Sequence, residues 1–496
     1  MKVQIKSSEN TIEIETNENN PLVAFAKNSI FINAYCGGKG VCKKCIVKYI
    51  TNPPQPTDKE TEIFTKEEIT DGYRLICLHK LKDNDYIEVF EAKPSFSKII
   101  NNICVDDDKN YIAIDIGTTT IAISLISNGK HKDTLNILNP QVSFGGDVIT
   151  RIAYSNEFSK ETLVSVLNSS ITKAIKTLKL KHNINSIKEI VASANPTMIA
   201  FFLNQDPKSI GEYPYTPPFV GSLKTKWNDI DTYIPPIIGA FVGSDITAGL
   251  INMDIKKNFL FIDIGTNCEF ILKYKDKIFA ASVPGGPALE GGGIDYGTIA
   301  KDGAIESLEF DSTLKIKTIN NKKPIGIAGS GLISAIALLR QFEIIDTSGR
   351  LLESWEIEDA PLQLINRIKK NGFLLDNNIF LTQNSIREFQ LVKASLNAGL
   401  QLLLNKTDIN INKIDTIYLA GGFTKSLTKK ELINSGLLTL DKEFIFLGNS
   451  SLNGSTQLFC KKNREFLENI SKRINYIEIA NENNFQELYL SNMDFK

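Results

Sequence analysis

Four of the seven cysteines in this 496-residue chain lie within its first 77 residues. Cys36, Cys42 and Cys45 share one glycine-rich loop, and Cys77 follows alone, which gives the spacing Cys-x5-Cys-x2-Cys-x31-Cys. A [2Fe–2S] cluster needs four thiolates, held by a loop whose N–H groups turn toward sulfur. Glycine permits the left-handed backbone that such a loop requires. We therefore predict that these four cysteines hold a [2Fe–2S] cluster.

A zinc ion with four cysteine ligands is the alternative. Zinc sites usually combine two short Cys-x2–4-Cys arms, whereas here three candidate ligands share one loop. The other cysteines, Cys104, Cys268 and Cys460, have no neighbour at ligand spacing. We expect each of them to be a buried or incidental thiol, and the odd cysteine count argues against a disulfide framework.

A second motif occurs twice. Asp115 ends the apolar segment 111–116 and precedes a Gly-Thr-Thr-Thr turn and another apolar segment. The same pattern returns 148 residues later (263 − 115) at Asp263, followed by Gly-Thr-Asn. Such turns expose N–H and hydroxyl groups to phosphate, and each aspartate can hold Mg²⁺ through water. The repeat predicts a duplicated fold with both turns facing one cleft. The candidate phosphate contacts are Gly117, Thr118, Thr119, Thr120, Gly265, Thr266 and Asn267.

Segments of small residues accompany these hairpins. Residues 239–249 read as a strand entering a helix, with Asp245 placed to orient an attacking water or, alternatively, to act as a helix N-cap beside Ser244. Residues 386–404 have apolar residues at helical spacing, with alanines and a glycine on one face. Small residues allow close helix–helix approach, and we expect this helix to serve a hinge between lobes.

Three glycine-rich segments are candidates for ligand contact. Residues 417–423 predict a strand that ends in Gly421, Gly422 and Phe423, where glycines let the backbone lie against a flat adenine ring. The loop 284–293 cannot be a helix or strand, and its Gly285 and Gly286 are candidates to face a ligand. Residues 329–331 precede an apolar helix and can bind an anion. Plain connection between elements is the alternative for the last two segments.

Composition limits the remaining possibilities. At roughly 150 residues per domain the length predicts about three domains. The 56 basic and 57 acidic side chains give a net charge of −1, so no global field attracts nucleic acid. There is no uncharged apolar run long enough to span a membrane. The N-terminus has no apolar signal core, from which we expect a cytoplasmic protein.

The N-terminal segment resembles a ferredoxin β-grasp domain, with the cysteine spacing of the adrenodoxin-like branch. Strands are expected at residues 3–6, 11–16 and 46–50, with a short helix at 22–27. From residue 110 onward, five of these segments resemble, in chain order, the phosphate-1, connect-1, phosphate-2, connect-2 and adenosine motifs of the actin-like ATPase superfamily. They are residues 111–120, 239–249, 261–267, 386–404 and 417–423. The resemblance implies an α+β ferredoxin domain followed by a two-lobed α/β actin-like ATPase of duplicated ribonuclease H-like fold.

The expected domain limits follow from these resemblances. They are residues 1–95 for the ferredoxin domain, 96–109 for a linker, 110–250 for lobe I, 251–470 for lobe II, and 471–496 for a C-terminal extension.

The two halves together resemble the reductive activators of corrinoid proteins. The Asn-Pro-Gln at 139–141 and the segment 145–152 also match that family, as does the GGPALEGG loop. The resemblance implies ATP- and Mg²⁺-dependent transfer of one electron from the [2Fe–2S] cluster to a corrinoid protein, which converts Co(II) to Co(I). It further implies an external electron donor and a possible homodimer. Asp115, Asp245 and Asp263 would be the catalytic residues.

Two other functions stay open on the sequence alone. One is a small-molecule kinase with a redox-sensing ferredoxin domain. The other is a ferredoxin electron carrier whose ATPase fold is inactive and serves for docking.

Overall fold

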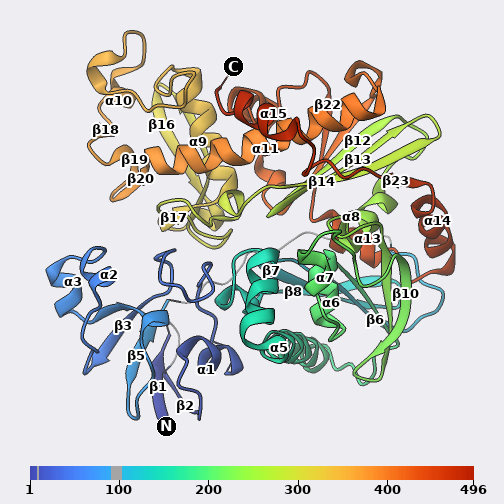
Figure 1. Ribbon diagram of the computed structural model, residues 1–496, viewed down its shortest axis with the longest axis horizontal. Helices are drawn as coiled ribbons and strands as arrows, with labels where there is room; N and C mark the ends of the chain where they lie inside the picture. Colours follow the sequence, from blue (N-terminus) through green and yellow to red (C-terminus); the bar gives the residue numbers. More distant parts are fainter. Residues whose placement is uncertain (8–10, 29, 91–102, 496) are drawn as a thin grey trace.

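The computed structural model describes residues 1–7, 11–28, 30–90 and 103–495. Its N-terminal domain is a five-stranded sheet of order β2-β1-β5-β3-β4 (Figure 1). β1 pairs antiparallel with β2 and parallel with β5, as a β-grasp fold requires. Pro21 begins α1, and the Asn20 side chain caps it by accepting from the N–H of Leu22. The elements are β1 (Lys2–Lys6), β2 (Thr11–Glu15), α1 (Pro21–Lys27), β3 (Ile46–Thr51), α2 (Asp58–Thr61), α3 (Lys66–Thr70), β4 (Tyr73–Leu75) and β5 (Tyr86–Val89).

Lobe I contains a six-stranded sheet of order β10-β11-β9-β6-β7-β8. β6, β7 and β8 form an antiparallel meander, and β9 runs parallel to β6. The long helix α5 packs on this sheet through its buried apolar stripe. The elements are β6 (Asn110–Ile116), β7 (Thr120–Ser127), β8 (Lys130–Leu138), α4 (Val148–Tyr154), α5 (Lys160–Lys181), β9 (Glu189–Ala194), α6 (Pro196–Phe202), α7 (Lys208–Gly211), β10 (Gly221–Trp227), β11 (Ile230–Ile237) and α8 (Ser244–Gly249).

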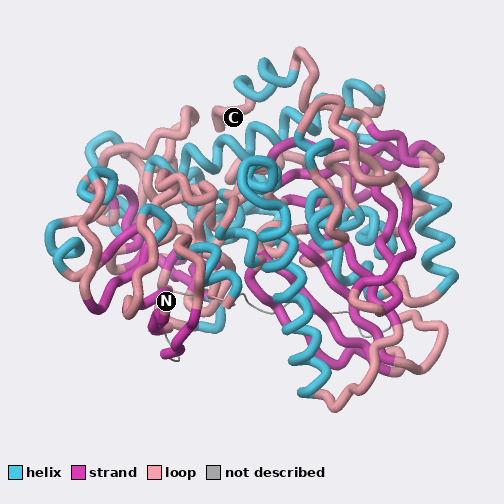
Figure 2. The backbone as a smooth tube through the Cα atoms, turned by 60° about the horizontal axis from the view of Figure 1, so that its bottom comes forward, coloured by secondary structure: helices cyan, strands magenta, loops and turns pink. Residues whose placement is uncertain are grey.

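Lobe II has the strand order β22-β21-β12-β13-β14-β23 and repeats the five-stranded core β11-β9-β6-β7-β8 of lobe I, while its sixth strand lies at the opposite edge. β12, β13 and β14 form the meander, and β21 runs parallel to β12. The main elements are β12 (Phe259–Ile264), β13 (Asn267–Tyr274), β14 (Lys277–Pro284), α9 (Gly329–Gln341), α11 (Gln383–Thr407), β21 (Thr416–Ala420), α12 (Lys429–Asn434), β22 (Glu443–Gly448), α13 (Ser450–Thr456), α14 (Lys461–Ser471), β23 (Ile474–Tyr476) and α15 (Phe485–Ser491). The predicted duplication is therefore confirmed, and Figure 2 shows the strands of both lobes with helices around them.

Two small sheets complete lobe II. They have the strand orders β16-β15-β17 and β18-β19-β20. Their elements, with the short helix α10, are β15 (Ala304–Asp311), β16 (Thr313–Thr318), β17 (Gly326–Ile327), α10 (Leu362–Ile365), β18 (Ile368–Lys369), β19 (Gly372–Asp376) and β20 (Ile379–Leu381).

The chain crosses between the lobes again after β22. α13 packs against α8, β6 and β9, and α14 packs against β10 and β11 of lobe I. β23 then joins the lobe II sheet, and Phe495 lies in the lobe II core. The described residues 471–495, part of the segment 471–496 that was expected as an extension, thus contribute to the sheet and core of lobe II.

The close helix contact between lobes is not made by the helix that the sequence suggested. α8 and α13 approach so closely that a Cβ on Gly454 would lie 1.9 Å from the carbonyl oxygen of Ala248. The small-residue helix α11 instead packs within lobe II, where Gly399 faces the side chain of Val283 on β14. The expectation of a hinge role for residues 386–404 is therefore corrected, since α13 occupies the position beside α8.

One expectation about cysteines is also wrong. Cys104 and Cys460 form a disulfide, with their Cα atoms 5.5 Å apart and a separation of 356 positions along the chain. A backbone bridge between Val105 and Phe459 brings the two segments together. Cys268 is a buried free thiol, as expected.

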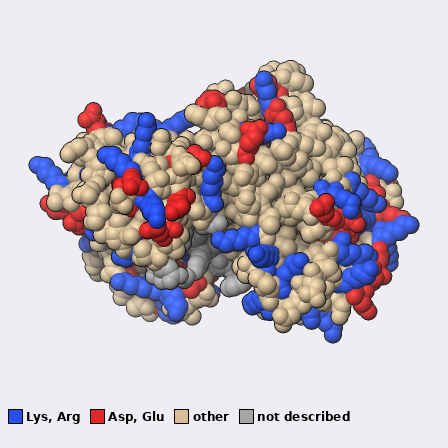
Figure 3. Space-filling model, turned by 90° about the horizontal axis from the view of Figure 1, so that it is seen from below, with Lys and Arg blue, Asp and Glu red and all other residues tan. Residues whose placement is uncertain are grey.

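The surface carries charges of both signs. On the face seen in Figure 3, blue and red side chains are intermixed around a broad uncharged area. Among the described residues, no helix has the length and apolar character that crossing a membrane would demand.

Candidate functional site

The four N-terminal cysteines lie as two neighbouring pairs. Sγ of Cys45 is 3.2 Å from Sγ of Cys77, and Cys36 is hydrogen-bonded to Cys42. Cys45 is buried, while the other three thiols are half-buried. In the described part of the chain, no three His, Cys, Asp or Glu side chains are grouped to hold a single ion. Two pairs of thiols match the need of a [2Fe–2S] cluster for two thiolates on each iron.

Each pair has one thiol that is favoured as thiolate and one that is not. The hydrogen bond to the partner thiol and burial raise the pKa of Cys42 and of Cys45. The pKa of Cys36 is lowered because it accepts hydrogen bonds from Cys42 and from the backbone of Val41 and Lys39, against the effect of burial. The pKa of Cys77 is lowered by Cys45, with a smaller contribution from the N–H of Gly40. Metal binding requires deprotonated cysteines and releases their protons, and in each pair one thiol is already favoured as thiolate.

Glycine at position 40 is favoured by the backbone conformation of the loop. Gly40 has φ of 71°, and a Cβ there would also lie 2.5 Å from Cδ2 of the flexible Leu78 side chain. Another residue would strain the backbone and displace Leu78 where the N–H of Gly40 approaches the Cys77 sulfur.

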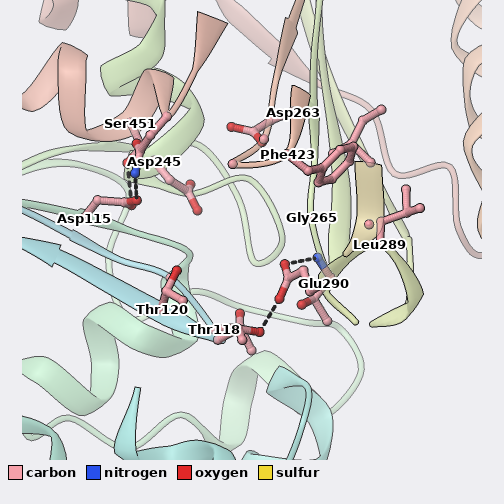
Figure 4. Close-up of a pocket in the computed structure, with 18 of the residues that line it drawn as sticks. Asp115, Thr118, Thr120, Asp245, Asp263, Gly265, Leu289, Glu290, Phe423 and Ser451 are labelled. Carbon is pink, nitrogen blue, oxygen red and sulfur yellow. Dashed lines mark hydrogen bonds between the residues drawn. The ribbon is translucent and has the colours of Figure 1, made fainter. Parts of the chain in front are cut away.

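The second candidate site is a cavity between the lobes. The hairpin turns β6–β7 and β12–β13 face it from either side, and Figure 4 shows Asp115, Asp245 and Asp263 directed into it. All the predicted nucleotide-site residues line the cavity except two. The lining includes Asp115, Gly117, Thr118, Thr119, Thr120, Asp245, Asp263, Gly265, Thr266, Asn267, Gly421, Gly422 and Phe423.

Gly285 and Gly286 lie outside this lining. Their N–H groups both donate to the carbonyl oxygen of Thr266, at 2.9 and 2.8 Å. Their N–H groups therefore stabilise the β12–β13 turn and are not free to bind a ligand. Residues 329–331 were the remaining glycine-rich candidate. Of these, Gly329 lines the cavity at the start of α9.

The hairpin turns present groups suited to phosphate. Oγ1 of Thr266 is buried and lacks a hydrogen-bond partner among the described residues. A buried polar atom without a partner is costly, so it indicates a place where a ligand atom belongs. Asn195 caps α6 and donates to Oγ1 of Thr118 at 3.3 Å, which holds that hydroxyl at the cavity edge.

The end of β21 offers room for a flat ring. Gly421 has φ of 124°, and a Cβ there would lie 2.4 Å from the carbonyl oxygen of Ile264. A Cβ on Gly422 would meet nothing within 4 Å, so open space adjoins this backbone. Phe423 borders the same space, as Figure 4 shows.

The acidic side chains repel one another inside the cavity. Burial, with the charge of Asp115 adding to it, raises the pKa of Asp245 to about 7. Burial and the charges of Asp245 and Asp115 raise the pKa of Asp263 to about 8. Glu269, opposite Asp263 in the β12–β13 ladder, also has a pKa raised by burial and by these neighbours. A divalent cation nearby would stabilise these carboxylates. Since no three of the described acidic side chains converge on one point, the residues fit Mg²⁺ held by one or two carboxylates together with water and phosphate.

Asp115 is held in place by groups that sequence reasoning missed. Ser451 donates to its Oδ1 and Asn449 to its Oδ2, each at 2.7 Å. Burial raises the pKa of Asp115, and these two hydrogen bonds oppose the increase. Asn449 is the N-cap of α13, a position recognisable only once the helix is known. Gly243, and not Asp245, is the N-cap of α8, so the capping alternative for Asp245 does not apply.

Glu290 is the other residue that was missed. Its Oε1 accepts from the N–H of Thr266 at 3.0 Å, and Oε2 accepts from Oγ1 of Thr119. It therefore connects the two phosphate-type turns across the cavity, as Figure 4 shows.

The raised pKa values predict how stability depends on pH. Asp245 and Asp263 titrate near 7 and 8 in the folded protein but have an ordinary pKa of 3.8. The folded state therefore holds protons that the unfolded state has lost, and this stabilisation fades as pH rises toward 8. Without Mg²⁺ and nucleotide, we expect Tm to fall from about pH 5.5 to about 8.5. The Tm of Asp263→Asn should fall less steeply over the same pH range. A slope equal to that of the wild type would contradict the raised pKa assigned to Asp263.

The fold and the two sites together define an iron–sulfur domain joined to an actin-like nucleotide-binding domain. Family models agree with this division. Residues 3–82 match the 2Fe-2S iron-sulfur cluster binding domain, and residues 111–258 match the RACo middle region. Residues 257–496 match the C-terminal domain of RACo, the ASKHA domain.

Individual proteins extend the comparison. The chain is 31% identical over 427 residues to corrinoid activation enzyme RamQ of Eubacterium limosum, which covers 77% of this chain and 70% of that one. It is 23% identical over 433 residues to the Co(II) methylated amine-specific corrinoid protein reductase of Methanosarcina barkeri, with 77% and 76% covered. A solved structure titled reductive activator for corrinoid, iron-sulfur protein aligns with a TM-score of 0.69 and 26% identity, over 99% and 98% of the two chains. The chain belongs to the family of reductive activators of corrinoid proteins, which confirms the prediction from its motifs.

Proposed function

We propose that the protein reduces the cobalt of a corrinoid protein from Co(II) to Co(I) in an ATP-dependent reaction. The observation that carries the proposal is the joining of two sites in one chain: paired cysteines on a ferredoxin fold, and an acidic cavity between two lobes. A [2Fe–2S] cluster would supply one electron at a time, and ATP the free energy. Family membership supports the corrinoid protein as the acceptor.

The energetics require coupling between these sites. Moving an electron through 100 mV against its gradient costs about 2.3 kcal/mol. A nucleotide state that binds one redox form of the partner a few kcal/mol more tightly shifts the equilibrium by that amount.

Specific roles follow from the geometry of the cavity. Asp115 and Asp263 would organise Mg²⁺, and Asp245, with a pKa of about 7, can accept a proton from the attacking water at neutral pH. The turn residues would bind the phosphates, and the end of β21 the adenine. The phosphate contacts would be Gly117, Thr118, Thr119, Thr120, Gly265, Thr266 and Asn267; the adenine contacts would be Gly421, Gly422 and Phe423.

The cysteines and the partners complete the proposal. Cys36, Cys42, Cys45 and Cys77 would hold the cluster. An external protein or small reductant would reload it. We further expect a cytoplasmic enzyme that can form a homodimer, with neither nucleic acid nor membrane among its partners.

The two alternative functions are not favoured by the family assignment, and product analysis separates them directly. A reductive activator should release inorganic phosphate, with turnover that rises when a Co(II) corrinoid protein is added. A kinase would instead place the γ-phosphate on a small molecule, and an inactive docking domain would release no phosphate. Either of these results would contradict the proposal.

A further inference from the structure

The cluster loop lies against both lobes of the nucleotide-binding domain. The N–H of Gly146 donates to the carbonyl oxygen of Tyr35 at 2.9 Å, directly before Cys36. Ser143 donates to the carbonyl oxygen of Ile32 at 2.8 Å. These contacts join the start of the cysteine loop to lobe I, and Figure 1 shows the ferredoxin domain beside this lobe.

The contact with lobe II is made by one side chain from within the cysteine motif. Lys44, between Cys42 and Cys45, donates from Nζ to the carbonyl oxygen of Ile294 at 2.9 Å. Lys44 is half-buried, and burial lowers its pKa, while the charges of Asp295 and Cys42 oppose the decrease. Its ammonium group therefore lies near both a candidate cluster ligand and the lobe II loop.

The same lobe II loop reaches into the nucleotide cavity at its other end. Glu290 is only four residues before Ile294, and its two carboxylate oxygens accept from Thr266 and Thr119. These are the donors that the phosphates are expected to use. A carboxylate and a phosphate oxygen cannot occupy the same donors at once, so nucleotide binding should displace Glu290.

The loop between the two contacts is constrained at its base. Gly291 has φ of 81°, and a Cβ there would lie 2.3 Å from the carbonyl oxygen of Thr298. Ser385 at the start of α11 donates its Oγ to the carbonyl oxygen of Asp295, and Thr382 donates to the Asp295 carboxylate. Displacement of Glu290 should therefore be transmitted along the loop. Only a short, constrained segment separates Glu290 from the Ile294 carbonyl group that Lys44 contacts.

We propose that Glu290 and Lys44 are positioning residues at the two ends of residues 290–295, through which phosphate-site occupancy sets the position of the cluster loop. Glu290 holds the phosphate donors when the cavity is empty, and a bound nucleotide takes its place. The displaced loop then shifts its contact with Lys44, which moves a positive charge beside Cys42. Charge and hydrogen bonding near the sulfurs set the reduction potential of an iron–sulfur cluster. This inference rests on the proposed nucleotide site. It adds the segment through which that site would influence the cluster loop.

The first test uses the electron paramagnetic resonance spectrum of the reduced cluster in the full chain. A non-hydrolysable ATP analogue with Mg²⁺ should change the wild-type spectrum. Lys44→Met should lose this change and keep the cluster itself. Lys43→Met is the matched control, since Lys43 is the neighbouring exposed lysine, and it should respond like the wild type. An intact nucleotide response in Lys44→Met, or none in the wild type despite bound nucleotide, would overturn the inference.

The second test addresses Glu290 by calorimetric titration with the same analogue. Glu290→Gln removes the negative charge but keeps the shape, so the analogue should bind several-fold more tightly than to the wild type. The nucleotide-free spectrum of Glu290→Ala should resemble that of nucleotide-bound wild type. Weaker binding by Glu290→Gln would instead make this residue part of the nucleotide site and contradict the displacement. If the wild-type protein binds no nucleotide, the proposed function itself is refuted. This result differs from weaker binding by Glu290→Gln alone, which would refute only the displacement of Glu290.

Discussion

Asp263→Asn should lower ATP turnover by about 10²-fold or more, the range seen when one preorganised charge-stabilising group is lost. The variant keeps the size of the side chain but removes the charge that would organise Mg²⁺ beside the phosphates. Asp263 lines the cavity at the end of β12, where burial raises its pKa to about 8. Mg²⁺ binding would stabilise its ionised form, and asparagine lacks that charge.

Misfolding can be separated from this effect. The substitution removes one of several mutually repelling carboxylates, so Tm at about pH 8 should be equal or higher than that of the wild type. Asp276→Asn is a suitable control because Asp276 is exposed in the β13–β14 turn of the same meander. It should turn over ATP at the wild-type rate. Full ATP turnover by Asp263→Asn would refute the placement of phosphate and metal in this cavity.

Cys42→Ser should abolish the visible absorbance of the cluster and reduce Co(II) reduction to the uncatalysed background. A serine hydroxyl is a poor substitute for thiolate, which is the ligand that iron–sulfur clusters use. The pairing makes the loss severe, since Cys36 would keep a hydrogen-bonding neighbour but the iron that this pair would hold would lose one of its two thiolates. Absorbance spectra of the reconstituted protein measure the first effect, and optical detection of Co(I) measures the second.

A free cysteine outside the candidate cluster site supplies the control. Cys268→Ala removes a buried free thiol on β13, and it should retain the full cluster spectrum. ATP hydrolysis without partner should persist in Cys42→Ser, because every described residue that lines the cavity lies in the nucleotide-binding domain. An unchanged visible spectrum in Cys42→Ser would reject the ligand set.

Local sequence was sufficient where a short segment determines its own geometry. The two Asp-x-Gly-Thr turns follow apolar strands, and both proved to be hairpins that face one cavity. The cysteine loop was likewise predictable, because its glycines have a left-handed backbone, as at Gly37 and Gly40, whereas the β-grasp fold was predicted from the resemblance to ferredoxins. Each turn and the three-cysteine loop is one continuous segment that carries both the residues and the backbone that positions them; Cys77 joins the loop from a separate element.

Contacts made by distant segments could not be predicted in this way. Asn449 and Ser451 reach Asp115 from more than 330 residues away, because α13 returns to lobe I after β22. Cys104 and Cys460 meet for a similar reason, across 356 residues. The GGPALEGG loop was noticed for its glycines, yet Glu290 is the residue that enters the cavity, while Gly285 and Gly286 lie behind the turn. Glycine content shows where a loop is irregular but not which side chain it directs inward.

The most direct test of ATP-coupled electron transfer follows cobalt itself. A Co(II) corrinoid protein, the reconstituted activator and a reductant too weak to form Co(I) alone are mixed anaerobically, and the absorbance of Co(I) is recorded. The account predicts that Co(I) accumulates only after Mg²⁺ and ATP are added, and not with Asp263→Asn or Cys42→Ser. Equal formation of Co(I) with and without ATP would contradict it.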